Sequence, residues 1–398
     1  ADVGYFWDFA HPVSGLARDR SDPRPGSDPD KVATGASGFG VMAIIIAAER
    51  GWIGRAAAAE RLLRMVRFLA KALRHHGVFP HFMHGATGAT IPFGPKDDGG
   101  DLVETSYLCM GLLTARRYFA SPDAREAELR TAIDALWRAV EWDWHTRGGD
   151  DVLYWHWSPN YAWDINLPIR GWNECLITYV LAASSPTHAI TADAYHRGWA
   201  AGGQFRNGRR YYGIPLPLGP DYGGPLFFAH FSFLGLDPRG LQDRYADYWE
   251  QNVNHTLINR EHCIRNPKRY KGYGRDCWGL TASDDHLGYH AHAPDHDLGV
   301  ISPTAALASF PYTPQHSMRA LRHFYLRLGD RIWGDYGFID AFNETLGWYA
   351  PSRLGIDQGP IVVMIENHRS GLIWKLFMSC PEVQHGLRIL GFRSPVIV

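Results

Sequence analysis

The sequence has no excess of charge of either sign and no long apolar run. Its 398 residues carry 40 Lys and Arg against 41 Asp and Glu, a formal net charge of −1. A chain without a basic excess has no long-range attraction for a polyanion, which argues against nucleic acid as a partner. The longest apolar run, residues 40–48, is far shorter than the roughly 20 residues of a membrane-spanning helix. We therefore expect a protein without a membrane span.

Cysteine is scarce and irregularly spaced. The five cysteines form no CxxC pair and no disulfide framework. Cys109 and Cys175 lie in apolar helical patterns, where a free thiol packs as a small hydrophobe. Cys263 and Cys277 lie in a loop-rich stretch, and the sequence leaves open whether they pair.

Signatures of several enzyme classes are also missing. There is no GxSxG nucleophile elbow, no P-loop and no HExxH zinc motif. The glycine-rich segment 35–40 follows no strand pattern, so it does not predict a nucleotide-binding loop. Residues 276–297 are rich in His and Asp but lack fixed ligand spacing, which favours hydrogen bonding to hydroxyl groups over metal catalysis. We expect no cofactor and no catalytic metal; a structural cation stays open.

Aromatic residues, in contrast, are abundant. The chain has 15 Trp, 19 Tyr and 19 Phe, or 13% of its residues. Aromatic rings stack on the apolar faces of sugars while their polar edges reach hydroxyl groups. A large core also contains many aromatics, so composition alone leaves both interpretations open.

Apolar residues recur at helical spacing along the chain, whereas alternating strand patterns are scarce. The predicted helices cover residues 37–50, 57–73, 102–119, 126–144, 173–183, 226–234, 241–254, 304–310, 317–328 and 361–378. Short and long connections alternate, as in a barrel of helical hairpins with long loops on one face. Pro225, Pro303 and Pro360 each stand where a predicted helix begins. We predict one all-α domain over residues 1–398, a helical toroid.

The candidate catalytic groups are acids beside aromatic or glycine residues. Hydrolysis of a glycosidic bond needs one protonated and one ionised carboxyl group, and burial of one of them separates their pKa values. Asp97, Asp101 and Glu104 form the first cluster, at the start of a predicted helix. Asp101 and Glu104 share one helix face, and capping is the alternative role for Asp101.

Glu174 is the preferred proton donor. It opens a predicted apolar helix after a run of aromatic residues, so its carboxyl should be buried and its pKa raised. The alternative is a surface Glu favoured by the helix dipole. Asp357, in a loop with Trp348 and Tyr349, is the third candidate, again with capping as the alternative. Glu366 is expected to be a buried structural carboxylate paired with a base such as Arg369.

Long segments of the chain resemble the glucoamylase-like bacterial proteins of glycoside hydrolase family 144. They are residues 5–21, 224–238, 278–283, 301–306, 310–314 and 356–367. The resemblance covers essentially the whole chain. It implies an (α/α)6 toroid and an inverting endo-β-1,2-glucanase that releases sophoro-oligosaccharides, although some relatives look exo-acting.

The resemblance also implies site residues. The family's acidic cluster falls on Asp97, Asp101 and Glu104, its acid on Glu174 and its C-terminal aspartate on Asp357. Many members of the wider group have a Ser-Thr-Ile-Asp-Thr-type segment where this chain has residues 101–105. That departure leaves open which carboxylate is the base, and Asp357 is a further candidate for it.

The expected partner is β-glucan, bound by a monomer in the periplasm or outside the cell, with the export signal removed. The stacking candidates are Trp7, Trp157, Trp172, Tyr273, Trp278 and Trp348, and the candidate hydroxyl contacts are Arg20 and His230. Exo action, another linkage and a non-catalytic glycan-binding protein of an uptake system are the alternatives. Several acids at loop ends argue against the last, because binding alone rarely needs them.

Overall fold

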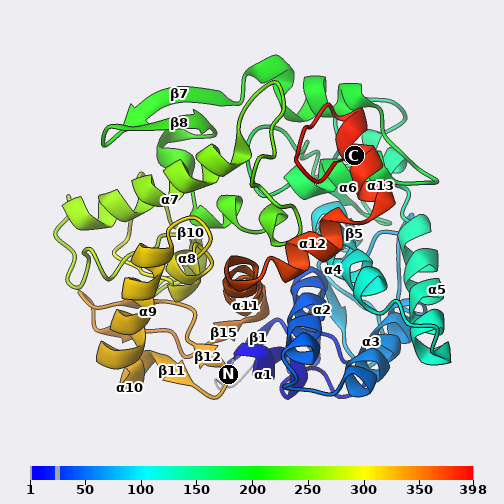
Figure 1. The fold of residues 1–398 in the computed structure, drawn as a ribbon, viewed down its shortest axis with the longest axis horizontal. Coiled ribbons are helices and arrows are strands. Elements are labelled where there is room, and N and C mark those ends of the chain that lie inside the picture. The colour runs from blue at the N-terminus through cyan, green and yellow to red at the C-terminus, as the bar shows by residue number, and fades with distance from the viewer. Residues whose placement is uncertain (1, 23–26, 398) are drawn as a thin grey trace.

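The computed structural model describes residues 2–22 and 27–397, most of them in helices and loops (Figure 1). The helices are α1 (Asp2–Trp7), α2 (Thr34–Glu49), α3 (Arg55–Leu69), α4 (Leu102–Tyr118), α5 (Ala124–Arg138), α6 (Leu176–Ser184), α7 (Tyr248–Arg265), α8 (Pro303–Leu307), α9 (Pro314–Arg327), α10 (Gly329–Ile332), α11 (Gly355–Arg369), α12 (Leu372–Met378) and α13 (Pro381–Ile389). Helical turns of other types are η1 (Trp142–Thr146), η2 (Ala194–Trp199), η3 (Ala201–Gly203), η4 (Asp221–Gly223), η5 (Leu226–Ala229) and η6 (Ser232–Leu234).

The inner helices pack in a ring. Helix α2 lies between α4 and α11, α4 contacts α6, and α11 contacts α8. The turns η5 and η6 contact each other, and η6 also contacts α6 and α11, so an irregular segment completes the ring. Almost every residue of α2, α4, α6 and α8 is buried, because these helices have neighbours on all sides. The outer helices α3, α5, α9 and α13 bury only one face and lie at the periphery of Figure 1.

This arrangement confirms the predicted all-α toroid. One hydrophobic cluster extends from Leu16 to Phe392, so α2 and α13 share a core. Glycines permit the closest helix contact: a Cβ on Gly38 of α2 would lie 2.2 Å from the carbonyl oxygen of Tyr107 in α4. A Cβ on Gly111 would come equally close to the Gly38 carbonyl oxygen, at 2.2 Å. The glycine-rich segment therefore serves helix packing.

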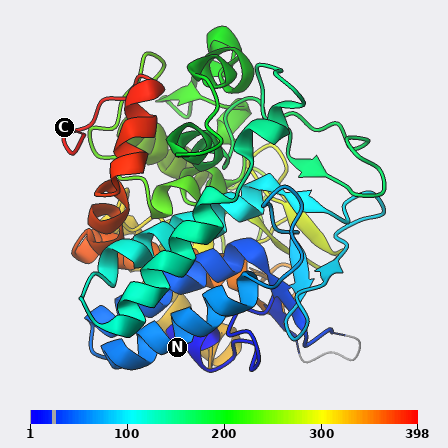
Figure 2. The ribbon, with the colours of Figure 1, turned by 90° about the vertical axis from the view of Figure 1, so that its right-hand side faces the viewer.

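The strands are short and lie in the loops. They are β1 (Arg20–Ser21), β2 (Lys31–Ala33), β3 (Phe82–His84), β4 (Thr90–Ile91), β5 (Gly100–Asp101), β6 (His156–Trp157), β7 (Arg206–Tyr211), β8 (Ile214–Leu218), β9 (Ala282–Asp284), β10 (Tyr289–Ala291), β11 (Trp333–Gly334), β12 (Gly337–Phe338), β13 (Phe342–Asn343), β14 (Trp348–Tyr349) and β15 (Arg353–Leu354). Antiparallel pairing of β1 with β15 and of β5 with β6 joins loops that are distant in sequence. Loops and short strands gather on the right-hand side of Figure 2, as expected for a toroid with one loop-rich face.

Several predicted helix boundaries are wrong. Residues 226–234 form η5 and η6 instead of one helix. Helix α11 begins at Gly355, so Pro360 lies inside it and does not start it. The predicted helix 361–378 is divided at Gly371, whose φ of +68 takes the chain out of the helical conformation.

Capping and ion pairing explain two further differences. Helix α7 begins at Tyr248, later than predicted, because the Asp247 carboxylate accepts hydrogen bonds from two backbone N–H groups of the first turn. Glu366 pairs with Arg50, the residue that follows α2, and not with Arg369, and this pair ties α11 to the end of α2.

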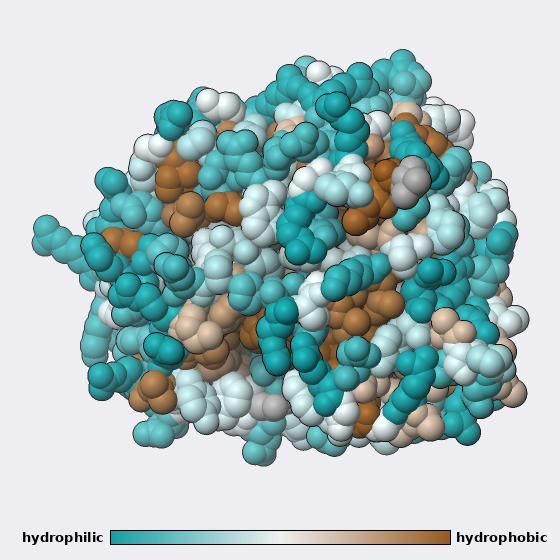
Figure 3. Space-filling view, in the orientation of Figure 1, coloured by the Kyte–Doolittle hydropathy of each residue, from teal (hydrophilic) through white to brown (hydrophobic). Residues whose placement is uncertain are grey.

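All five cysteines are buried free thiols, so Cys263 and Cys277 do not pair in this structure. Within the described ranges, no helix combines the length and apolarity that a bilayer crossing requires. Hydrophilic residues cover most of the face in Figure 3, and hydrophobic areas on it are small and separate.

Candidate active site

One cavity of about 430 Å³ gathers most of the candidate acids. Its ionisable lining residues include Asp19, Arg20, Lys31, His81, Glu104, Glu174 and Asp357. Its aromatic lining residues are Phe82, Phe93, Tyr107, Trp155, Phe227, Phe231 and Tyr289. A volume of this size and a mixture of apolar walls with few polar groups are typical of a ligand site.

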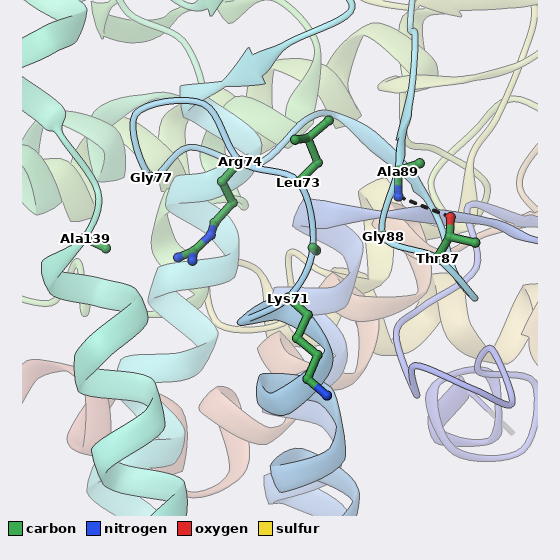
Figure 4. A pocket seen from close by; sticks show the side chains of 9 residues that line it. Lys71, Leu73, Arg74, Gly77, Thr87, Gly88, Ala89 and Ala139 are labelled. Carbon is green, nitrogen blue, oxygen red and sulfur yellow. Dashed lines mark hydrogen bonds between the residues drawn. The ribbon is translucent and has the colours of Figure 1, made fainter.

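A second hollow, of about 590 Å³, lies beside the end of α3 (Figure 4). Lys71 and Arg74 line it together with the turn at Thr87, whose hydroxyl accepts a hydrogen bond from the Ala89 N–H, 3.3 Å away. No carboxylate lines this hollow. It therefore lacks the paired acids that glycoside hydrolysis needs.

Glu174 lies in the turn before α6, two residues ahead of the first helical residue, Leu176, whereas the predicted helix began at residue 173. The Ser232 hydroxyl donates a hydrogen bond to the Glu174 carbonyl oxygen and accepts one from the Ile177 N–H, 3.0 Å away, which fixes this turn. Burial, with the nearby Glu104 carboxylate, raises the pKa of Glu174 to about 7. Near neutral pH the group is therefore partly protonated, as a general acid must be.

Glu104 lies in the first turn of α4 and also lines the cavity. One carboxylate oxygen accepts a hydrogen bond from the Gly35 N–H, 2.7 Å away. Burial is the main cause that raises the pKa of Glu104 to about 7, and the Asp101 charge adds to it. Glu104 and Glu174 thus both line the cavity, and a charge on either group opposes ionisation of the other.

Asp101 is the N-cap of α4, and it is not among the residues that line the cavity. It accepts hydrogen bonds from the backbone N–H groups of Val103 and Glu104 (3.0 and 2.9 Å), from Trp155 Nε1 (3.0 Å) and from His81 Nδ1 (3.1 Å). Burial opposes ionisation, yet the hydrogen bond from His81 and the neighbouring charges hold the pKa of Asp101 below its ordinary value. The contacts of Asp101 are therefore those of an N-cap, the alternative role that the sequence left open for it.

Asp97 lies close to Asp101 and His156. The Asp97 Oδ2 and His156 Nε2 atoms are 3.4 Å apart, and burial raises the pKa of Asp97. Ligand atoms of Asp97, Asp101 and His156 lie within 4.8 Å of one another, a spacing that metal ligands also have. Both carboxylate oxygens of Asp101 already accept hydrogen bonds, one from His81 and the other from Trp155. The primary role of this group of side chains is therefore to hold Asp101 as the cap of α4.

Asp357 belongs to a second acidic group, which the sequence interpretation only partly found. Burial and the neighbouring Asp340 carboxyl group raise the pKa of Asp357 well above its ordinary value. Asp340 is itself buried, which raises its pKa to about 7. Its Oδ2 accepts a hydrogen bond from the Asp284 N–H at 2.6 Å, and Arg20 Nη1 contacts both Asp284 oxygens at 3.1 and 3.0 Å.

The sequence interpretation missed Asp340, although Gly337, Phe338 and Phe342 near it resemble the neighbours that marked the other acids. Asp340 stands between the buried residues Ile339 and Ala341, a pattern that predicts core packing. Only the long-range contact with α11 brings its carboxyl group to Asp357.

Three predicted sugar contacts are buried in the core and are corrected. Trp278 is 0% exposed and Trp172 only 4%, so neither ring has a free face for a sugar. His230 Nε2 pairs with Ser309 Oγ at 2.9 Å, and burial lowers the pKa of His230 to about 3. These side chains fill the toroid and do not line the cavity.

Two further stacking candidates are also engaged elsewhere. Trp7 in α1 lies under the guanidinium of Arg61, whose central carbon is 4.3 Å from the ring centroid. Tyr273 donates a hydrogen bond to Asp297 Oδ1 at 2.8 Å. Neither residue lines the cavity.

The remaining candidates lie at or near the cavity. Arg20 lines both the cavity and an adjoining hollow of about 500 Å³, which Trp348 and Tyr289 also line. Trp157 is half-buried outside the cavity, edge-on to His76 with ring centroids 5.2 Å apart. Arg20 and Trp348 thus stay candidates for sugar contacts beside the acids.

Comparisons with known proteins identify relatives of this chain. The family model Glycoamylase, described as "Putative glucoamylase", matches residues 166–381. The endo-beta-1,2-glucanase of Chitinophaga pinensis, solved with sophorotriose and glucose, is 57% identical with a TM-score of 0.97, and 99% of this chain and 96% of that chain are covered.

Relatives from Parabacteroides distasonis are longer. Its beta-1,2-glucanase structure is 48% identical with a TM-score of 0.94, covering 98% of this chain and 58% of that chain. The exo beta-1,2-glucooligosaccharide sophorohydrolase (non-reducing end) of this species is 49% identical over 409 residues. The match covers 98% of this chain, which spans only 56% of that curated relative.

A helical toroid with carboxyl groups around a partly aromatic cavity is the architecture expected of a glycoside hydrolase. The chain belongs to the matched family, the glucoamylase-like proteins of glycoside hydrolase family 144. The resemblance in the sequence motifs is thereby confirmed.

Proposed function

We propose that this protein hydrolyses β-1,2-glucosidic linkages within β-1,2-glucan chains. The observation that carries the proposal is that Glu104, Glu174 and Asp357 line one cavity, with Asp340 buried next to Asp357. The β-1,2 linkage rests on relatives whose names state that linkage.

Glu174 is the proposed general acid, because its pKa of about 7 leaves a proton available near neutral pH. Its proton passes to the glycosidic oxygen as the bond to the anomeric carbon breaks. A water molecule attacks that carbon from the opposite face and gives its proton to the base, which inverts the configuration.

Asp357 is the proposed base. It lies on α11, whereas Glu174 precedes α6, so the two groups reach the cavity from different inner segments of the ring. The neighbouring carboxyl groups of Asp340 and Asp357 oppose each other's ionisation, so Asp357 can act as a base only after this pair has lost a proton. Glu104 is the competing candidate for the base, because it also lines the cavity.

We further propose internal cleavage. The support for it is the similarity to the endo-beta-1,2-glucanase of Chitinophaga pinensis, which is 57% identical, against 49% for the exo-acting relative.

The test is a time course on linear β-1,2-glucan, with laminarin, β-1,4-glucan and starch in parallel. Early release of sophoro-oligosaccharides of many lengths supports internal attack, whereas sophorose alone from the first minutes identifies exo action. NMR of the first anomer formed distinguishes inversion from retention. Products from another polymer only would contradict the proposed substrate, and binding without any product would contradict hydrolysis.

A further inference from the structure

The loop that leads to Glu174 carries an aromatic group that the proposed mechanism does not use. A hollow of about 460 Å³ lies on the surface there, lined by Glu141, Asp143, Trp144, Arg147, Gly148, Trp163 and His188. None of these residues lines the catalytic cavity. The volume lies within the roughly 300–1,000 Å³ of small-molecule sites.

Two tryptophans shape this hollow. Trp144 is 39% exposed, an unusual position for so large a ring. One face of its indole is covered by the His76 ring, stacked at 3.8 Å and 13°. Trp163 lies beside it, with ring centroids 6.4 Å apart and an angle of 34° between the planes. Two tilted indoles give a flat apolar ligand two walls.

The rings are held in place from behind. Arg147 lies over Tyr154 and Trp163, with its guanidinium carbon 4.5 and 5.8 Å from the two ring centroids. His145 meets Trp163 edge-on at 5.4 Å. Ring positions fixed before binding reduce the entropy that a ligand contact costs.

The polar groups of the hollow already have partners. Glu141 Oε2 lies 2.9 Å from His76 Nδ1, and Asp143 Oδ1 lies 3.1 Å from His188 Nδ1. Arg147 Nη1 donates to Asn166 Oδ1 at 2.5 Å. Partnered groups of both signs beside exposed indoles favour an uncharged ligand with flat apolar faces and many hydroxyl groups. A chain of neutral sugars has this chemistry.

One chain segment lies near both the hollow and the cavity. Trp155 lines the cavity, and Trp157, two residues further along the same segment, lies edge-on to Trp144 with ring centroids 6.4 Å apart. We propose that the hollow between Trp144 and Trp163 is a second glucan-binding site, which holds a long chain on the surface near the catalytic cavity. The choice of β-1,2-glucan as its ligand rests on the proposed function.

The first test compares Trp144→Ala and Trp163→Ala on long β-1,2-glucan and on a short sophoro-oligosaccharide that only the cavity needs to bind. We expect the KM for the polymer to rise roughly five- to tenfold in each variant, since a lost ring contact weakens binding by about that factor. Rates on the short substrate should match the wild type, which also shows that the variants fold. Trp52→Ala is the matched control, because Trp52 is 61% exposed in another part of the surface.

The second test counts sites by calorimetry, with Glu174→Gln to prevent hydrolysis. Two equivalents of sophoro-oligosaccharide should bind to this variant and one to Glu174→Gln/Trp144→Ala. Equal stoichiometry and an unchanged polymer KM would overturn the second site while hydrolysis by the wild type continued. If the wild type hydrolyses no β-1,2-glucan, the proposed function fails instead, and the same titration with other glucans then tests the hollow on its own.

Discussion

A carboxylate oxygen of Glu104 in α4 accepts a hydrogen bond from the Gly35 N–H in the first turn of α2, 2.7 Å away. The contact places a cavity acid at the positive end of a neighbouring helix, which partly offsets the cost of its burial. It also requires glycine, since a Cβ at position 35 would lie 2.6 Å from the Glu104 Oε2 atom.

Gly35→Ala should therefore lower activity about tenfold or more, because Glu104 must shift and small displacements of cavity groups slow catalysis strongly. The free energy of unfolding should change less, because alanine favours the helix by about 1 kcal/mol while overpacking costs a similar amount. Rates on β-1,2-glucan and chemical denaturation measure the two effects. Gly54→Ala is the control, since its Cβ would meet nothing within 4 Å. Equal activity of the two variants would show that the position of Glu104 is unimportant.

Glu174→Gln should reduce kcat by roughly 10² to 10⁴, the usual contribution of a general acid. The amide keeps the shape of the side chain, so the circular dichroism spectrum should not change. Glu250→Gln, at an exposed position in α7, serves as the control and should retain full activity. A Glu174→Gln enzyme with near-normal kcat would exclude Glu174 as the proton donor.

The pH profile should report the same group. Glu174 is active while protonated, so kcat/KM should fall as pH rises through about 7, the pKa of Glu174. The Glu104 charge raises that pKa, so Glu104→Gln should move the alkaline limb to lower pH. Rates between pH 4 and 9 on β-1,2-glucan measure the shift. An alkaline limb that does not move would show that the Glu104 charge has no effect on the pKa of Glu174.

The free energy of unfolding should also depend on pH, because burial raises the pKa of Glu174. The folded-state pKa of Glu174 is raised from 4.5 to about 7, so between these values the folded protein retains a proton that the unfolded chain has lost. The contribution of Glu174 to the free energy of unfolding therefore falls as pH rises through that window, by up to about 3 kcal/mol. Glu174→Gln should lose less stability than the wild type between pH 4.5 and 7.5 in urea titrations. Parallel curves for the two proteins would show that Glu174 is not buried in an apolar setting.

Trp278 provides a test of the corrected assignment. Because its ring is 0% exposed, Trp278→Ala should cost about 3–5 kcal/mol of stability through the cavity it leaves. Trp348→Ala, beside Arg20 at the adjoining hollow, should instead raise KM with little loss of stability. Thermal unfolding and steady-state kinetics separate the two outcomes, and a stable Trp278→Ala protein with a raised KM would restore the stacking role.

The sequence by itself determined the helical content of the ring and most of the acids that line its cavity. Helical spacing of apolar residues is a local property, so it predicted the helices near residues 37–50 and 102–119. An acid next to aromatic residues is also a local pattern, and Glu174 does line the cavity.

Tertiary structure decided what depends on distant parts of the chain. The contact of Asp340 with Asp357, the choice of Arg50 as the partner of Glu366, and the burial of Trp278 all depend on packing between separate segments. A tryptophan in a loop has the same local sequence whether its ring faces a sugar or the core. Only the packing of the closed ring of helices decides which face of the tryptophan side chain meets water.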